Sequence, residues 1–358
     1  MMIVPGIEHF SKEYVIARPK DLFPSNYITI IIKTSDEDGL RFVGNLLDVE
    51  SPVMMARNES FTTVVKKMTG HSIYKIRHVS RNALYGVVVY GFGSSTAMDT
   101  LQDLGHKGKL FFTMFPIQLE NRKNIFAQFI ITTDRQTKVD FLFEYADINR
   151  TVVITTGVTY FDIPSSALMF RIGNKYTSIQ STSYCYRACE YHSDIVYESM
   201  IPADKWCRHF VIPPIHTASR FKIRTVSRNK NTTITIKTSR GYLYTRNGDP
   251  IEIDLSPESY FVSASLPILL SLYTLVETKG IIMMIVPGIE QFSKEYVIAP
   301  PKDPSYTNYI TITIKTSDVD GLRLFGNLLD LESTVIKAQN ESCKENDWSF
   351  SLQNTTCV

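Results

Sequence analysis

The chain repeats its own beginning near its end. Residues 1–60 return as residues 283–342 at a constant offset of 282 positions, and 45 of the 60 aligned pairs are identical without a gap. Self-similarity at a fixed period is the sequence signature of an array of structural units. We therefore interpret the chain as one unit of 282 residues followed by the start of a second. On this interpretation it is an excerpt of a longer array, in which Met1 is an internal position.

A shorter motif recurs inside the 282-residue unit, as an aromatic residue, a few apolar residues and then proline. Its prolines are Pro19, Pro116 and Pro213, which lie 97 residues apart each time. Proline cannot donate to a sheet ladder, so it fits strand ends and unit boundaries. Each motif, including the copy that opens at Tyr296, is followed by a strand pattern, at residues 27–32, 126–131, 221–226 and 309–314.

The composition and the local patterns favour strands over helices. Hydrophobic residues make up 44% of the chain, and Val, Ile, Thr and aromatic residues are common, as in pleated sheets. Residues 233–237 alternate polar and apolar side chains, and Asn247-Gly248 is a strong hairpin signal. Six to eight short strands in about 95 residues indicate a small antiparallel sandwich. We predict an all-β fold of tandem sandwich-like modules at residues 1–104, 105–196 and 197–282, with a truncated second copy of the first at 283–358.

Several local features carry finer predictions. The apolar stretch 260–275 contains Pro267 and is too short to span a bilayer comfortably, so we expect two buried strands around a turn. Residues 95–104 and 202–206 are the candidate short helical pieces. A local basic run predicts one solvated strand face, at Lys222, Arg224, Arg228 and Lys230.

Charge and sorting signals limit the compartment and the partners. The formal net charge of +2 favours neither nucleic acid nor an anionic membrane as partner. The first residues lack a basic stretch followed by an apolar one, so no secretory leader is predicted here. Five acceptor sequons for N-glycosylation favour an extracellular protein, at Asn58, Asn149, Asn231, Asn340 and Asn354.

Five cysteines are the candidates for disulfide bonds: Cys185, Cys189, Cys207, Cys343 and Cys357. A disulfide bond between Cys207 and either Cys185 or Cys189 would close a short loop. A bond between Cys343 and Cys357 would close another, which leaves one cysteine unpaired. Cys185, Cys189 and Cys207 also lie near His192 and His209 in sequence. Their spacing matches no strong zinc signature, so a disulfide is favoured over a metal site.

No catalytic, cofactor or metal site is predicted. Asp36 and Asp38 precede Gly39 and recur in the second copy, but a calcium loop needs further ligands, and the pattern suits a turn. The chain has no Gly-x-Ser-x-Gly elbow. The glycine-rich residues 91–95 lack the lysine of a phosphate loop. His9 is replaced by Gln291 in the second copy, so it is not essential if both copies do the same work.

One stretch resembles a known family. Residues 198–214 combine Pro202, Trp206 and an aromatic-apolar-apolar-Pro-Pro run, and a strand and the Asn-Thr-Thr-Ile-Thr of residues 231–235 follow. This layout is similar to the N-terminal domain of IgGFc-binding proteins, and residues 87–92 and 267–270 fit the same pattern. Cys207 departs from it, since a glycine is usual beside the tryptophan. The resemblance implies a secreted or cell-surface, non-enzymatic protein that acts in adhesion or in mucus-like matrices, but it carries over no set of Fc-contacting residues.

Together these features predict a non-enzymatic extracellular binding or adhesion protein, glycosylated and disulfide-bonded. Its partner would be an extracellular protein or glycan, without cofactor, nucleic acid or membrane insertion in this fragment. Repetition would convert weak contacts into avidity. One alternative is an array of carbohydrate-binding modules that uses exposed Tyr and Trp side chains. A less favoured alternative is a metal-dependent hydrolase built on the cluster between Cys185 and His209. Trp206 itself is expected to be a core or inter-module anchor.

Overall fold

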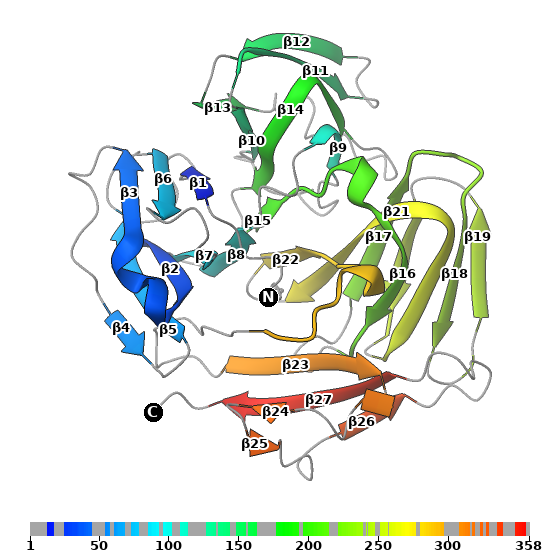
Figure 1. Cartoon of the computed structure of the whole chain (residues 1–358). Helices are drawn as coiled ribbons and strands as arrows, with labels where there is room; N and C mark the ends of the chain where they lie inside the picture. Colours follow the sequence, from blue (N-terminus) through cyan, green and yellow to red (C-terminus); the bar gives the residue numbers. More distant parts are fainter. Residues whose placement is uncertain are drawn as a thin grey trace.

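The structure is a computed structural model of the whole chain (Figure 1). It describes residues 13–17, 25–44, 54–57, 61–68, 73–78, 85–92, 96–101, 108–113, 127–133, 135–143, 148–154, 157–162, 177–192, 196–214, 221–238, 241, 243–247, 251–256, 258–276, 280–296, 308–315, 317–318, 323–324, 327–328, 335–338 and 348–355. Within these residues the chain is almost entirely strand, and every pair of neighbouring strands is antiparallel. The predicted all-β class is confirmed.

Seven strands form the sheet of residues 207–285, which we call the third unit. They are β16 (Cys207–Ile212), β17 (Phe221–Ser227), β18 (Thr233–Thr238), β19 (Leu243–Asn247), β20 (Ile251–Leu255), β21 (Tyr260–Val276) and β22 (Gly280–Ile285). The order is β19-β18-β21-β17-β20, and β16 and β22 also pair with β21. The third unit is therefore organised around one long strand.

The two halves of β21 serve two layers of a sandwich. Its first half, residues 260–264, pairs with β16 and β18. Its second half, residues 268–276, pairs with β17 and β22. Between them Leu266 is 36% exposed. The prediction of two strands around a turn at Pro267 is wrong in form, because one strand continues through this point and passes from one layer to the other.

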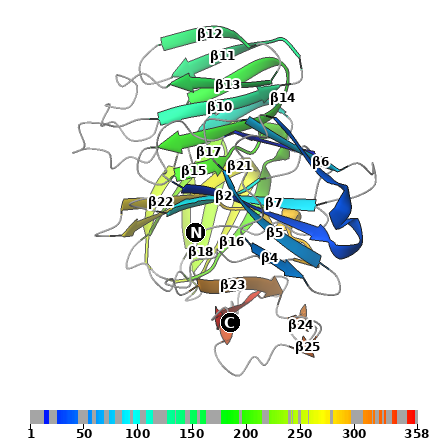
Figure 2. The ribbon, with the colours of Figure 1, turned by 90° about the vertical axis from the view of Figure 1, so that its left-hand side faces the viewer.

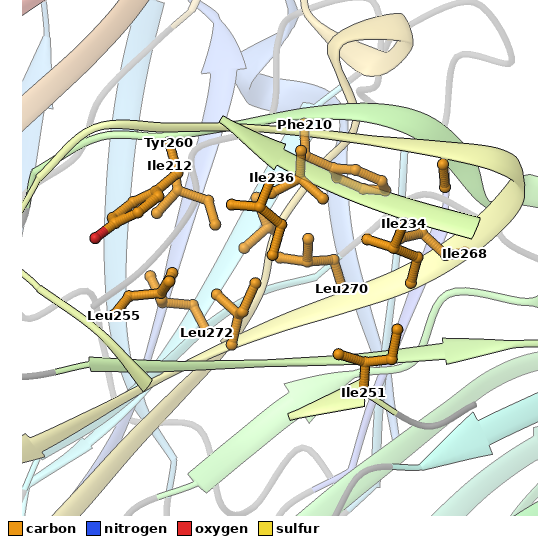
Figure 3. Packing of buried hydrophobic residues seen from close by; sticks show 14 of the residues in the cluster. Phe210, Ile212, Ile234, Ile236, Ile251, Leu255, Tyr260, Ile268, Leu270 and Leu272 are labelled. Atoms are coloured by element: carbon orange, nitrogen blue, oxygen red, sulfur yellow. The ribbon is translucent and has the colours of Figure 1, made fainter. Parts of the chain in front are cut away.

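The core of the third unit lies between these two layers. Figure 3 shows Ile212, Ile236 and Tyr260 facing Leu255 and Leu272 across it. The alternation predicted for residues 233–237 is present, since Ile234 and Ile236 are buried whereas Thr233 and Thr235 are partly exposed. Alternate apolar side chains therefore make one dry face, as the period of a strand requires.

The second unit has the same strand order as the third. Its strands are β9 (Gly108–Thr113), β10 (Ala127–Thr133), β11 (Thr137–Phe143), β12 (Ile148–Ile154), β13 (Gly157–Asp162), β14 (Thr177–His192) and β15 (Val196–Ser199). The order is β12-β11-β14-β10-β13, with β9 and β15 on β14. The long strand β14 again divides its pairing, with β11 at its start and with β10 and β15 towards its end. Stacked rings fill its interior, with 4.1 Å between the centroids of Phe141 and Phe161.

The first unit divides the long strand into two. Its strands are β1 (Glu13–Ala17), β2 (Ser25–Lys33), β3 (Leu40–Gly44), β4 (Met54–Arg57), β5 (Phe61–Met68), β6 (Ile73–His78), β7 (Tyr85–Phe92) and β8 (Thr96–Leu101). They form two sheets of order β1-β6-β3 and β4-β5-β2-β7-β8. β6 and β7 thus take the places that the two halves of β21 take in the third unit.

The second copy of the repeat adds a smaller set of strands, at the bottom of Figure 1. These are β23 (Asn308–Lys315), β24 (Arg323–Leu324), β25 (Asn327–Leu328), β26 (Val335–Ala338) and β27 (Trp348–Thr355). The order β23-β27-β26 corresponds to β2-β5-β4 in the first unit. Figure 2 shows these strands at one end of the molecule and β10 to β14 at the other.

One local prediction is corrected and one is confirmed. Residues 96–101 form strand β8 rather than a helical piece, since pairing with β7 satisfies their backbone. Residues Ala203–Lys205 form the short 3-10 helix η5, as expected. The predicted boundaries after residues 196 and 282 fall inside β15 and β22. The division at residues 1–104, 105–196, 197–282 and 283–358 stays a prediction.

Candidate functional site

The most informative site is the place where the repeated sequence meets the third unit. We call residues Met283–Ser293, the start of the second copy, the docking segment. Its first three residues end strand β22 and pair with β21, with Met284 opposite Leu272. The Val286 N–H then continues the ladder by donating to the Leu270 carbonyl at 2.9 Å. The docking segment therefore forms an edge strand of the unit that precedes it.

The side chains of the docking segment are buried on both faces of that sheet. Met284 and Val286 belong to the sandwich core. Met283 and Ile285 point into a second cluster on the opposite face, and all four are at most 8% exposed. Alternation along an edge strand explains this division. At about 25 cal/mol per Å² of apolar area, four buried side chains stabilise the docked state by several kcal/mol before ordering costs are counted.

Beyond its strand, the docking segment turns over β16. Residues Ile289–Gln291 form the 3-10 helix η6, and Ile289 and Phe292 pack against Val211 and Phe261. The turn is closed by the Gly288 N–H, which donates to the Gln291 side-chain oxygen at 3.0 Å. A small apolar cluster thus covers the outer side of β16.

An ion pair and two weaker hydrogen bonds join η6 to β16 and η5. His209 Nδ1 lies 2.8 Å from Glu290 Oε1, with both side chains nearly half exposed. The Arg208 N–H points to the same oxygen at 3.4 Å, and the Gln291 amide donates to the Lys205 carbonyl at 3.4 Å. Partial burial acts to raise the pKa of Glu290. The hydrogen bonds from its own backbone, His209 and Arg208, with the attraction of His209, outweigh burial and hold that pKa below its ordinary value.

Gly288 is required by its contact with Cys207. A Cβ at position 288 would lie 2.1 Å from Cys207 Cβ and 2.6 Å from Cys207 Sγ. Only glycine allows this backbone to approach so closely. The docking segment is therefore matched to β16 by shape as well as by pairing.

Cys207 is a free thiol in this structure, so its predicted bond to Cys185 or Cys189 is not formed. It packs instead under Gly288. Burial first, and then the charge and hydrogen bond of Glu290, raise the pKa of Cys207 to about 12. Because the thiolate is the nucleophile and the metal ligand, Cys207 is poorly suited to either role. This weakens the hydrolase alternative.

The other candidate cysteines and sequons lie in several places. Cys185 and Cys189 lie in β14, and Cys343 and Cys357 fall outside the described residues. Among the sequons, Asn149 lies in β12, Asn354 in β27 and Asn231 in an exposed turn. Asn58 and Asn340 fall outside the described residues. Pairing among the four remaining cysteines, and glycosylation, stay predictions.

Trp206 is an anchor between units, as predicted, and not a sugar platform. It is 7% exposed, and its indole N–H donates to the Ile201 carbonyl at 3.1 Å. Its ring lies 5.2 Å from that of Phe112 in the second unit. The same cluster holds Val226 from the third unit. A sugar needs an exposed ring face, so this residue does not support the carbohydrate alternative.

The basic run is not one solvated face. Arg224 is 3% exposed, whereas Arg228 and Lys230 are exposed. Lys222 lies 2.6 Å from Glu252 and is partly buried. Arg224 is covered because its face of β17 also carries Val226, which packs in the cluster of Trp206. The sequence prediction failed because strand alternation does not reveal that both faces are covered.

A turn built on paired hydroxyl groups was not predicted from the sequence. Ser227 and Thr232 share a hydrogen bond across the β17–β18 turn, and both hydroxyls reach the Asn229 carbonyl. In the second unit Thr133 and Thr137 make the same arrangement 3.2 Å apart, with the Arg135 carbonyl. The sequence contains a signal for this turn: Ser or Thr at the end of one strand is followed by Thr four or five residues later. These hydroxyls hold the turn that presents Asn231.

The described side chains include no group of three or more His, Cys, Asp or Glu that could hold a metal ion. Asp36 and Asp38 lie in the 3-10 helix η2 (Thr34–Gly39), where Ser35 donates to Asp36 at 3.2 Å. In the second copy Ser317 makes the same contact with Asp318 at 2.8 Å. The first aspartate of the pattern thus makes the same local contact in both copies, and Asp320 lies outside the described residues. No helix within the described residues is long and apolar enough to cross a membrane.

Comparisons with known proteins find a matching family. A family model described as IgGFc binding protein matches residues 162–354, more than half of the chain. Curated proteins give no match. A solved structure of an anti-sigma factor domain-containing protein aligns over 77% of this chain and 82% of that one, with 9% identity and a TM-score of 0.16. A TM-score this low supports no argument. The family match runs across residue 283 and so includes both the third unit and the docking segment.

Proposed function

The chain belongs to the IgGFc binding protein family, and from this premise we propose that it is a non-enzymatic extracellular protein that binds macromolecules through repeated β units. The observation that carries the proposal is the family match over residues 162–354. Two units of equal strand order and a second copy of the repeat support it. Several tethered contacts raise the apparent affinity without any new contact, because each further contact is effectively intramolecular.

The proposed partner is an extracellular protein, and the Fc region of immunoglobulin G is the first probe because the family bears its name. The exposed hairpin of β18 and β19 is a candidate contact surface. Arg246 lies 5.0 Å over the ring of Tyr244, and Thr245, Arg246 and Asn247 are exposed. Arg and Tyr are enriched among residues that dominate binding energy. Within the part of the chain that the structure describes, β19 pairs only with β18 and is an edge strand of its sheet.

Secretion and glycosylation are part of the proposal. Asn231 is exposed, and the Asn229 side chain, rather than its own, accepts the hydrogen bond from the Asn231 N–H at 2.9 Å. Its side chain is therefore not needed to hold the turn. A sequon asparagine presented in this way is a suitable acceptor for a glycan.

The test measures binding of the full chain, produced with a leader in secreting cells, to immobilised Fc. Fab from the same antibody is the matched control. Expected is saturable binding to Fc and none to Fab, weakened at least fivefold by Arg246→Ala and unchanged by Arg228→Ala, which removes an exposed arginine on another turn. Equal binding to Fc and Fab would reject Fc as the specific partner. No binding to Fc, together with a blank glycan array, would overturn the binding function itself.

A further inference from the structure

The outer edge of the second unit is formed by β11 and β12, and Figure 1 and Figure 2 both show β12 at the top of the molecule. Within the part of the chain that the structure describes, β12 pairs only with β11 and ends the sheet order β12-β11-β14-β10-β13. The backbone groups on the outer side of an edge strand can pair with a strand of another molecule. This edge is therefore a place where self-association has to be prevented.

Apolar side chains add to the tendency of this edge to associate. Val153 is 58% exposed on β12, and Leu142 is 42% exposed on β11. Leu142 belongs to the solvent face of β11, because the alternate residues Val139 and Phe141 are buried. A single exposed apolar residue is ordinary on a protein surface, but two of them beside an edge strand favour pairing with another molecule.

The same strand contains a glycosylation sequon, Asn149-Arg150-Thr151. Asn149 lies at the register position opposite Leu142. Alternation along β12 places position 149 on the same face as Thr151 and Val153, and both of these residues are exposed. At about 3.3 Å per residue, Val153 is roughly 13 Å from Asn149 along the strand, which is within the length of a glycan of several sugar rings.

The equivalent edge strand of the third unit provides a comparison within the same chain. β19 also ends its sheet, in the order β19-β18-β21-β17-β20. Among the side chains that the structure describes on β19, the exposed ones are polar, at Thr245, Arg246 and Asn247. The sequence of β19 contains no sequon. The edge strand that exposes an apolar side chain is therefore the one that carries an acceptor for a glycan.

We propose that Asn149 carries an N-linked glycan that shields the apolar edge of the second unit from self-association. In the transfer, the Asn149 amide nitrogen attacks C1 of the first sugar of a lipid-pyrophosphate-linked oligosaccharide. A C–N bond forms, the C–O bond to the pyrophosphate breaks, and the amide proton is released. Because a glycan is bulky and solubilising, it covers Leu142 and Val153 and obstructs the addition of a strand to β12. The inference rests on the secretion in the proposed function, since the sugar donor belongs to the secretory pathway.

The first experiment compares the full chain, secreted from cells with a leader, with its Asn149→Gln variant. Expected are a glycan on the peptide that contains Asn149 and self-association of the variant that is stronger by about fivefold or more in sedimentation velocity. The control Asn231→Gln removes the sequon of an exposed turn and should leave association unchanged. An unmodified Asn149 beside an occupied Asn231 would overturn the shield and leave the proposed secretion standing. Absence of a glycan from every sequon would reject both.

A second experiment separates the shield from any effect of glycosylation on folding. The folded, secreted chain is treated with an endoglycosidase that leaves one sugar on each modified asparagine, and its self-association is measured again. Expected is an increase in the unmodified chain and none in Val153→Lys, because a charge on an edge strand opposes pairing. The control Thr245→Lys adds the same charge to β19 and should keep the increase. An equal increase in Val153→Lys, or no increase in the unmodified chain, would overturn the proposal.

Discussion

Truncation of Leu272 to alanine tests the crossing strand on which the third unit depends. Leu272 is fully buried and lies in β21 opposite Ile223 on one side and Met284 of the docking segment on the other. The change removes three carbons, worth about 0.8 kcal/mol each, or about 2.4 kcal/mol. The cavity left behind adds to this, so we expect a loss of about 3 kcal/mol within the usual range of about 2–5 kcal/mol.

The matched control is Leu266→Ala on the same strand. Leu266 is 36% exposed where β21 passes between the layers, so we expect a loss of about 1 kcal/mol or less. Urea unfolding is followed by tryptophan fluorescence in a Trp348→Phe background, which leaves Trp206 as the single reporter, since the chain has two tryptophans. A loss below about 1 kcal/mol for Leu272→Ala, or one equal to that of the control, would refute the assignment of Leu272 to a two-layer core.

Three further predictions concern the junction and the β17–β18 turn. The pKa of Glu290 is lowered in the folded protein, so the charged Glu290 side chain stabilises the fold above the unfolded pKa near 4.5, and this stabilisation is lost as pH falls through the folded pKa. Glu290→Gln should therefore flatten the pH dependence of the unfolding midpoint below pH 4.5. An unchanged slope would contradict this. Folding raises the pKa of Cys207 from 9.0 to about 12, so Cys207 should react with iodoacetamide at pH 8 about a thousandfold more slowly in the folded than in the unfolded chain. Equal labelling rates of the peptide that contains Cys207 would argue against its burial under Gly288. Asn231 should carry a glycan in protein from secreting cells. The glycan is measured as a mass shift that Asn231→Gln removes and the control Asn229→Gln keeps. An unmodified Asn231 in a secreted chain whose other sequons are occupied would reject this glycosylation site alone.

Part of the fold could be predicted because its causes are local. Alternation in residues 233–237 fixes which side chains share a face, since successive strand residues point to opposite sides. The recurring prolines indicated units of similar strand pattern, and the second and third units do share one strand order. Trp206 was expected to be an anchor, because a large ring beside apolar strands gains most by burial.

The rest could not be predicted because it depends on which strands meet. Pro267 indicated a turn, yet β21 continues through it because each half finds its own partners in a different layer. Arg224 belongs to an alternating basic run, yet a second unit covers its face. The free Cys207 could not be foreseen either, because its neighbour Gly288 lies more than 80 residues further along the chain.

The repetitive, strand-built character of this protein follows from its residue order, because period-two alternation and self-similarity are properties of that order alone. The end of a unit, in contrast, depends on contacts between residues that are distant in sequence. The repeat begins at Met283, but the strand that contains Met283 completes the sheet before it. The physical reason is that an edge strand belongs to the sheet that satisfies its hydrogen bonds and buries its side chains, and those contacts are made between residues far apart in sequence.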